Sequence, residues 1–118
     1  ASNAKKTYIK IYEEWIKQSF FIKYPKFDII TNRVKIEITA YLKIPKSTSK
    51  KMAEKMLDDE ISPLKKPDID NIAKVVLDAI NNYVIKDDIQ VSKMSVEKKY
   101  SENEKLIIKI EEYWKKAK

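Results

Sequence analysis

A strict alternation of apolar and polar residues from Val34 to Ile44 constrains the fold of this chain more than any other feature. The apolar positions are Val34, Ile36, Ile38, Ala40, Leu42 and Ile44. The positions between them are Lys35, Glu37, Thr39, Tyr41 and Lys43. Because successive side chains of a strand point to opposite faces, this pattern predicts one long strand that is buried on one side.

Weaker patterns predict the other elements. Apolar residues at three- and four-residue steps predict an amphipathic helix over about 6–20. A cap at Ser47 or Ser49 predicts a short polar helix that runs to about residue 58. A second apolar stripe predicts a helix over about 71–84, and two final strands are expected over about 90–100 and 105–113. These elements predict an α+β fold, a small single domain in which a mixed β-sheet packs against two or three helices.

The length of 118 residues suits one domain with one modest core. Ser2-Asn3-Ala4 has the composition of a scar left by removal of an expression tag, so residues 1–4 are set aside and the domain is expected over 5–118. No apolar run approaches the roughly 18 residues of a membrane helix. We therefore expect a cytoplasmic protein that does not contact the membrane.

Three missing residue types narrow the chemistry. The sequence contains no Cys, no His and no Gly. Thiol nucleophiles, Ser–His catalysis, zinc sites built on Cys or His, and glycine-rich phosphate loops are therefore excluded. Carboxylates, lysines, tyrosines and hydroxyls remain as reactive groups. Their oxygen atoms favour hard ions such as Mg²⁺ or Mn²⁺.

The net charge of +7 and the pI of about 9.4 suggest a polyanionic partner such as a nucleic acid. A second interpretation stays open. Arg33 is the only arginine among 25 basic residues, and isoleucine and asparagine are also abundant. An AT-rich genome produces that bias without selection for binding.

An acidic segment precedes the 71–84 helix, with the sequence Lys65-Lys66-Pro67-Asp68-Ile69-Asp70-Asn71. Pro67 disfavours helical geometry in the residue before it, so we expect the chain to enter this segment extended. In an extended chain Asp68 and Asp70 would share one side and Ile69 would turn into the core. A divalent ion between the two carboxylates would relieve their repulsion. Asp70 also stands at the expected N-cap of the helix, where an Asp can simply satisfy a free backbone N–H.

Further charged residues follow. Lys74 and Asp78 lie at four-residue steps from Asp70, which suits either i,i+4 ion pairs or an ammonium placed beside a cleaved phosphate. Asp87 and Asp88 are expected to open the next strand, although adjacent Asp residues are also common turn formers. Only one of these two can share a face with the first pair, and the residues alone do not say which. We expect three carboxylates to fold together around a hard cation.

The spacing of these residues resembles that of the RusA-like Holliday junction resolvases, small endonucleases that cut four-way DNA junctions. The matching positions are Lys66-Pro67-Asp68-Ile69-Asp70-Asn71, Lys74, Asp78-Ala79-Ile80 and Lys86-Asp87-Asp88-Ile89-Gln90-Val91. The resemblance implies a RusA-like fold and a magnesium-dependent, structure-specific endodeoxyribonuclease that resolves junctions by paired phosphodiester cleavage in recombination and repair. Mn²⁺ is expected to substitute for Mg²⁺.

The resemblance also assigns roles. The metal-site and catalytic aspartates of the family map to Asp68, Asp70 and Asp88, and its essential lysine maps to Lys74. Lys65 and Lys66 are the nearest candidates for contacts with DNA phosphates. The implied partners are branched DNA with four-way junctions and a second copy of the chain in a homodimer, with no small-molecule substrate. Phage or prophage origin is common in the family.

Two departures and two alternatives accompany this assignment. The connection from the helix to Asp88 is about one residue shorter than in some family members. Family members begin with a strand and a basic loop, whereas this sequence runs from the apparent tag scar straight into Lys5-Lys6-Thr7-Tyr8. The alternative functions are a non-catalytic branched-DNA-binding module derived from such a nuclease, and a metal-stabilised structural or oligomerisation domain.

Overall fold

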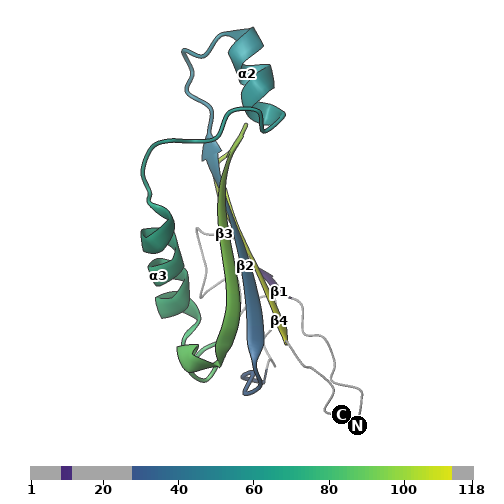
Figure 1. The fold of residues 1–118 in the computed structure, drawn as a ribbon, viewed down its shortest axis with the longest axis vertical. Coiled ribbons are helices and arrows are strands. Elements are labelled where there is room, and N and C mark those ends of the chain that lie inside the picture. The colour runs from purple at the N-terminus through teal and green to yellow at the C-terminus, as the bar shows by residue number, and fades with distance from the viewer. Residues whose placement is uncertain (1–8, 12–27, 113–118) are drawn as a thin grey trace.

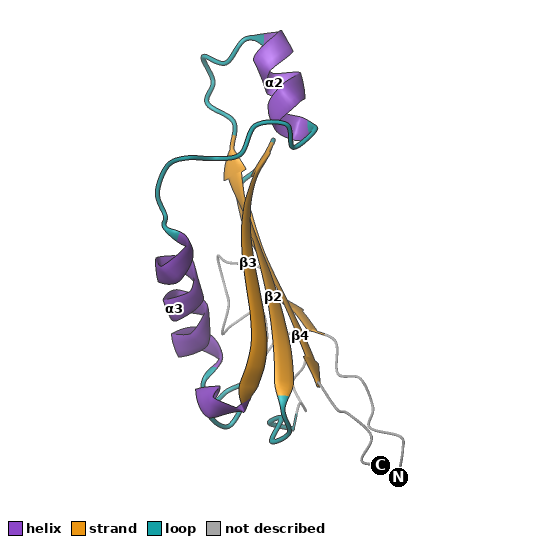
Figure 2. Ribbon diagram, in the orientation of Figure 1, coloured by secondary structure: helices purple, strands orange, loops and turns teal. Residues whose placement is uncertain are grey.

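The computed structural model describes residues 9–11 and 28–112. Within these ranges the chain forms four strands in one sheet and two α-helices (Figures 1 and 2). The elements are β1 (Ile9–Ile11), β2 (Val34–Lys43), α2 (Lys50–Leu57), α3 (Ile69–Ile80), the 3₁₀ helix η2 (Asp88–Gln90), β3 (Val91–Ser101) and β4 (Lys105–Glu112). Neither α-helix in these ranges is long and apolar enough to cross a bilayer.

The sheet has the strand order β1-β4-β2-β3. The central strand β2 pairs in parallel with β3 and antiparallel with β4, and β4 pairs antiparallel with β1. Parallel strands need a crossover connection, and here the segment containing α2 and α3 supplies it. Figure 1 shows α3 alongside one face of the sheet and α2 near the end of β3. The predicted α+β domain with a mixed sheet is confirmed.

One hydrophobic core joins α3 to the sheet. Alternate residues of β2 from Val34 to Ala40 and of β4 from Leu106 to Ile110 contribute to it, together with one stripe of α3 and the residues that follow that helix. The buried residues are Ile30, Val34, Ile36, Ile38, Ala40, Ile72, Val76, Ile80, Val84, Ile85, Leu106, Ile108 and Ile110. In the described part of the chain no polar or charged residue is buried. The core therefore contains no unpaired charge whose desolvation would oppose folding.

The strand predictions are confirmed within two residues at each end. β2 covers Val34–Lys43, and β3 and β4 cover the two predicted C-terminal strands. The predicted polar helix is also confirmed as α2, and Ser49 rather than Ser47 caps it by accepting a hydrogen bond from the backbone N–H of Met52 at 3.3 Å. The helix expected over 71–84 begins earlier, at Ile69, and ends earlier, at Ile80.

The helix predicted over 6–20 is wrong at Ile9–Ile11, which form strand β1. The rest of that range lies outside the described residues. β1 pairs with β4 in the register Ile9↔Ile110 to Ile11↔Ile108. A local apolar pattern does not reveal a pairing partner about one hundred residues away in the chain, and here backbone pairing with β4 decides the structure.

The β2–β4 pair is the centre of the core, so truncation there has a large effect. Ile108 is fully buried and lies opposite Ile38. We expect Ile108→Ala to lower the free energy of unfolding by about 2–5 kcal/mol, because it removes buried methyl groups and leaves a cavity. Urea unfolding measures the change. The control is Ile89→Ala at a side chain that is 86% exposed, where a change within about 0.5 kcal/mol is expected. Equal effects of the two substitutions would contradict the assignment of the core.

Candidate active site

Asp68 and Asp70 lie at the beginning of α3. Asp68 is the N-cap, with extended backbone angles (φ −74°, ψ 154°), and its carbonyl accepts a hydrogen bond from the Ile72 N–H at 3.0 Å. The Asp68 carboxylate makes no capping hydrogen bond, and Asp70 lies within the first helical turn. The prediction that Asp70 is the N-cap is therefore wrong. Ile69, which we expected in the core, is the first helical residue and is 44% exposed.

Asp68, Asp70 and Lys74 line one open hollow of about 680 Å³ on the surface. Lys66, Pro67 and Asn71 complete its wall, and the set is called the Asp68 hollow here. The free N–H groups at the start of a helix, together with the helix dipole, favour anions at this end of α3. The hollow thus combines two carboxylates with two ammonium groups and the N-terminus of a helix.

The donor set of the Asp68 hollow suits a hard divalent cation. Carboxylate oxygens are preferred ligands of Mg²⁺, which keeps several of its waters when few protein ligands are available. Asp68 and Asp70 are both exposed, so neither carboxylate is held by the core and the hollow has room for water and for a phosphate group. Lys74 lies one helical turn beyond Asp70, on the same wall.

Asp87 and Asp88 lie at the other end of α3, in a tight local structure that sequence reasoning missed. We expected a strand at this point, but the chain forms the 3₁₀ helix η2 before β3 begins. Asp87 Oδ1 accepts a hydrogen bond from the Ile89 N–H at 3.1 Å, and Gln90 Oε1 accepts one from the Asp87 N–H at 2.7 Å. These two reciprocal hydrogen bonds form a capping box between Asp87 and Gln90. The Asp-x-x-Gln spacing of the two residues is the sequence pattern that could have predicted it.

Gln90 also anchors this turn to the body of the protein. Its side-chain amide Nε2 donates to the Ile30 and Asn32 carbonyl oxygens, both at 2.8 Å. The position of Asp88, the first residue of η2, is thereby tied to the chain segment that enters β2.

The described residues of one copy do not bring Asp88 to the other two carboxylates. Asp88 does not line the Asp68 hollow, and in residues 9–11 and 28–112 no group of three or more acidic side chains lies close enough to hold a metal ion. The 12 residues of α3 separate the two places, a length of about 18 Å. The expected gathering of the three carboxylates is therefore not seen among the described residues of one copy. The assignment of Asp68, Asp70, Asp88 and Lys74 as catalytic residues stays a prediction.

The two adjacent carboxyl groups at η2 interact with each other. The hydrogen bond from the Ile89 backbone N–H, followed by a side-chain hydrogen bond with Asp88, lowers the pKa of Asp87. The same side-chain hydrogen bond raises the pKa of Asp88, and desolvation and the negative charges of Asp87 and Asp78 raise it further. Asp88 is therefore the member of the pair that takes up a proton first as the pH falls.

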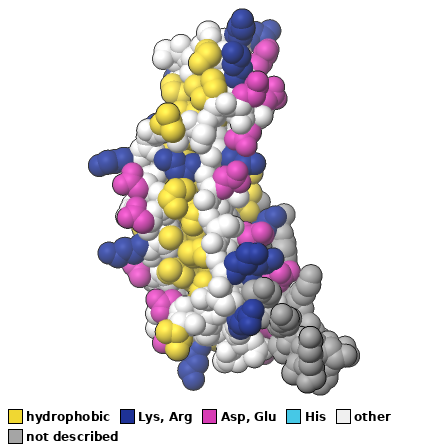
Figure 3. Space-filling view, viewed as in Figure 1, with side chains coloured by type: hydrophobic (Ala, Val, Ile, Leu, Met, Phe, Trp, Pro, Cys, Tyr) yellow, Lys and Arg dark blue, Asp and Glu magenta, His cyan; other side chains and the backbone are white. Residues whose placement is uncertain are grey.

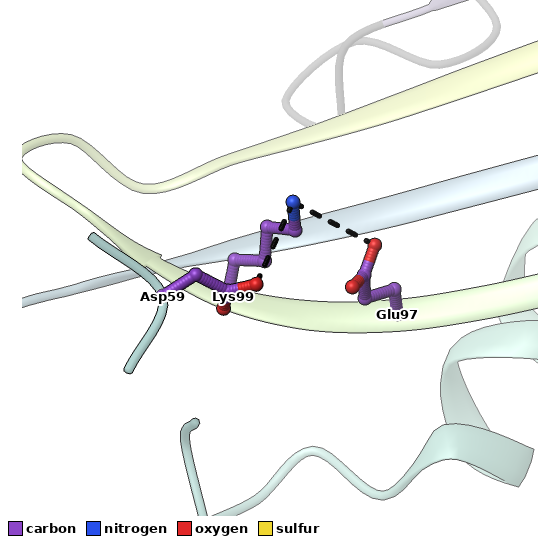
Figure 4. A network of polar contacts seen from close by, with 3 residues as sticks. All are labelled: Asp59, Glu97 and Lys99. Atoms are coloured by element: carbon purple, nitrogen blue, oxygen red, sulfur yellow. Dashed lines mark ion pairs between the residues drawn. The ribbon is translucent and has the colours of Figure 1, made fainter. Parts of the chain in front are cut away.

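The loop that leads into α3 is held by lysines of β3. Lys98 Nζ donates to the Lys65 carbonyl oxygen at 2.6 Å. Lys99 Nζ lies 3.8 Å from Asp59 Oδ2 and 3.8 Å from Glu97 Oε1 (Figure 4). Such half-exposed ion pairs contribute at most about 1 kcal/mol each to the free energy of unfolding. The two ion pairs of Lys99 therefore add little to the stability of the fold.

Lys65 and Lys66, the predicted DNA contacts, lie in this loop. Lys66 lines the Asp68 hollow, and Lys65 Nζ lies 5.9 Å from the centre of the Tyr100 ring. Over the face shown in Figure 3, basic side chains are interspersed with acidic ones and form no single patch. On this face, binding to a polyanion would depend on local groups of lysines rather than on one broad basic surface.

Comparison with known protein sequences agrees with the motif. The sequence model described as endodeoxyribonuclease RusA matches residues 3–111. The chain belongs to this family. It is also 42% identical over 86 residues to YqaN of Bacillus subtilis (strain 168), which is described as an uncharacterized protein. That match covers 71% of this chain and 61% of the relative, so the chain spans less than two thirds of the relative's length.

The interaction between Asp87 and Asp88 predicts two separate titrations. In the metal-free protein we expect the Asp88 carboxyl to titrate at a higher pH than that of Asp87, as followed by carboxyl carbon chemical shifts in NMR. Asp87→Asn should move the pKa of Asp88 down toward its ordinary value, because it removes the carboxylate that accepts the Asp88 proton. Asp78→Asn serves as the control and should lower it less. An unchanged Asp88 titration in Asp87→Asn would show that the two carboxyl groups do not interact.

Proposed function

We propose that this protein is a Mg²⁺-dependent endodeoxyribonuclease that resolves Holliday junctions by paired phosphodiester cleavage, with Mn²⁺ able to replace Mg²⁺. The observation that supports it best is the meeting of Asp68, Asp70 and Lys74 in one hollow, in a chain of the RusA family. Its substrate is branched DNA in the cytoplasm, in recombination and repair, and its working form is a homodimer. A phage or prophage role in recombination fits the same chemistry.

The residues of the Asp68 hollow have separate tasks in this proposal. A divalent ion, when bound, offsets charge on the phosphate and lowers the pKa of a bound water. Asp68 and Asp70 hold that ion at the start of α3. Lys74 directs its ammonium to the same space and offsets the negative charge that develops on the phosphate during cleavage. Lys65 and Lys66 neutralise neighbouring backbone phosphates, so affinity for DNA falls as salt rises.

Asp88 contributes to the site of the other copy in the proposed homodimer. Because α3 separates Asp88 from the Asp68 hollow, Asp88 of the same copy does not complete the set of three carboxylates in this arrangement of the chain. A second copy can bring its own Asp88 to the hollow, and a symmetric dimer then contains two complete sites. Two sites related by symmetry suit a substrate that is cut on two opposed strands.

Removal of one carboxylate from the Asp68 hollow should largely abolish cleavage of DNA but leave binding of DNA intact. We expect Asp70→Asn to reduce Mg²⁺-dependent cutting of a four-way junction by at least about a hundredfold, since it removes a charged metal ligand but keeps the shape of the residue. Junction binding without metal, measured by gel mobility shift, should stay close to that of the wild type.

Asp78→Asn is the matched control, because Asp78 is an exposed carboxylate on the same helix that does not line the hollow. It should leave cutting nearly unchanged. Loss of folding and binding together in Asp70→Asn would instead support a structural role for this residue. A melting temperature that rises with Mg²⁺ while the wild type cuts nothing would favour a metal-stabilised structural domain.

One observation favours the non-catalytic branched-DNA-binding module. The described residues of a single copy bring together only two of the three predicted carboxylates. That function predicts that wild-type protein binds four-way junctions but cuts neither junctions nor linear DNA at any Mg²⁺ or Mn²⁺ concentration. The cleavage assay on the wild type therefore decides between the two functions.

Mixing two inactive variants tests whether a site is shared between copies. Asp70→Asn and Asp88→Asn are each expected to be inactive alone. In a mixed dimer with shared sites, one site carries both substitutions and the other carries neither, so nicking of one strand should return. If each site lies within one copy, both sites of the mixed dimer are damaged and no cutting returns. Nicked and linear products are separated on denaturing gels, with Asp70→Asn mixed with Asp68→Asn as the control that should stay inactive.

A further inference from the structure

A second hollow opens beside the Asp68 hollow and shares Lys66, Pro67 and Asn71 with it. It has a volume of about 330 Å³ and lies between α3 and the neighbouring ends of β2 and β4. The remaining lining residues are Ala40, Tyr41, Leu42, Lys65, Ile72, Val75, Glu104, Lys105 and Leu106. This second hollow is called the α3 slot here.

The interior of the α3 slot is apolar. Ala40 and Leu106 are neighbours across the β2–β4 pair, both are buried, and both belong to the core face of the sheet. Ile72, also buried, contributes from α3. Val75 lies on the same helix but is 50% exposed, which places it where the slot opens to solvent. A planar apolar group entering between helix and sheet would contact these four side chains.

The charge of the α3 slot is positive. Three lysines and one glutamate line it. Lys65 is held in place through its carbonyl oxygen by Lys98 Nζ at 2.6 Å. The alternation of β2 places the Tyr41 ring on the opposite face of the sheet, and the Lys105 ammonium lies there too, with Nζ 4.9 Å from the ring centre. The polar groups that remain in the slot are Lys65, Lys66, Glu104 and the Asn71 amide, and two lysines against one glutamate keep its charge positive.

We propose that the α3 slot receives one unpaired nucleobase of the DNA strand whose phosphate lies in the Asp68 hollow. This inference rests on the proposed function and adds a subsite to it. Asn71 lies in the wall between the two hollows, so its amide can hydrogen-bond the edge of the base. Lys66 lies in the same wall and neutralises the phosphate that joins the two nucleotides.

Size, polarity and substrate geometry favour a base over other occupants. A volume of about 330 Å³ is at the lower end of pockets that take small ligands. Enzymes that take a base out of the stack hold it against apolar side chains and read its edge with hydrogen bonds, and the cost is least where the base is already unpaired or poorly stacked. Branch points of DNA supply such bases. An apolar side chain from a second copy would fill the interior but would gain nothing from the lysines.

Fluorescence of 2-aminopurine tests the inference directly. Four-way junctions carry this base at one position each, over the nucleotides that flank the branch point, and wild-type protein is added to saturation without divalent metal. We expect a several-fold rise in fluorescence at one position, where the base leaves the stack. Val75→Phe places an aromatic ring in the mouth of the slot and should abolish that rise.

Two control variants complete the test. Val75→Ala widens the slot and should keep the fluorescence rise, and Met52→Phe adds the same ring at a 41%-exposed side chain of α2 away from the slot and should also keep it. Melting temperature and circular dichroism verify folding, and each variant is used at a concentration that saturates the junction. The proposal is overturned if no position responds, or if Val75→Phe responds as the wild type does. It is also overturned if Val75→Phe changes only the oligomeric state, which would identify a second copy as the occupant.

The readout separates this inference from the proposed function, because fluorescence requires neither metal nor cleavage. One outcome is that the wild type shows the fluorescence rise, and Val75→Phe loses it, while the wild type cuts no junction. That result would overturn the proposed nuclease function and support the base subsite. If the wild type cuts junctions but no position shows a fluorescence rise, the proposed nuclease function is supported and the base subsite is overturned.

Discussion

The packing of α3 on the sheet is the interaction on which the candidate site depends. Ile72, Val76 and Ile80 form one buried stripe of this helix, and they join the apolar faces of β2 and β4 in a single core. This stripe fixes the rotation of α3 about its axis and its position along the sheet. It therefore also fixes where the N-terminus of α3 lies in space. The Asp68 hollow and the α3 slot both lie at that beginning and share three residues, so any change that shifts the stripe alters both hollows together.

Regular patterns with many repeats were predictable from sequence, and single contacts were not. The alternation of β2 runs over ten residues and predicted both the strand and its buried face. The start of α3 was misplaced by two residues, because Asp68 and Asp70 are equally good N-cap residues and only tertiary packing chooses between them. β1 was missed because its three residues are strand only through pairing with β4. Family members begin with a strand, but the sequence at the start of this chain departs from that pattern and predicted a helix there.

The candidate site was predictable in its residue types but not in its geometry. Asp68, Asp70 and Lys74 are close in sequence, so one helix start brings them to one hollow. Asp88 is separated from them by the full length of α3, and its position follows from the capping box of Asp87 and Gln90 and from the two hydrogen bonds of the Gln90 amide. A helix between two motifs places them at its opposite ends, but spacing in sequence does not say whether Asp88 would act in its own copy or in the second copy of the proposed dimer.

In the proposed function, the charges in the Asp68 hollow would give a bound divalent ion a second role besides chemistry. Lys66 and Lys74 supply two positive charges and Asp68 and Asp70 two negative ones, so the hollow is neutral (2 − 2 = 0) although the chain as a whole carries +7. A phosphate that approaches this neutral hollow meets two carboxylates that repel it. With a divalent ion in place the sum becomes +2, and a bound ion is then the largest local charge. In the proposed function, binding of DNA elsewhere on the protein is therefore independent of metal, while a bound divalent ion strengthens the binding of the phosphate in the hollow.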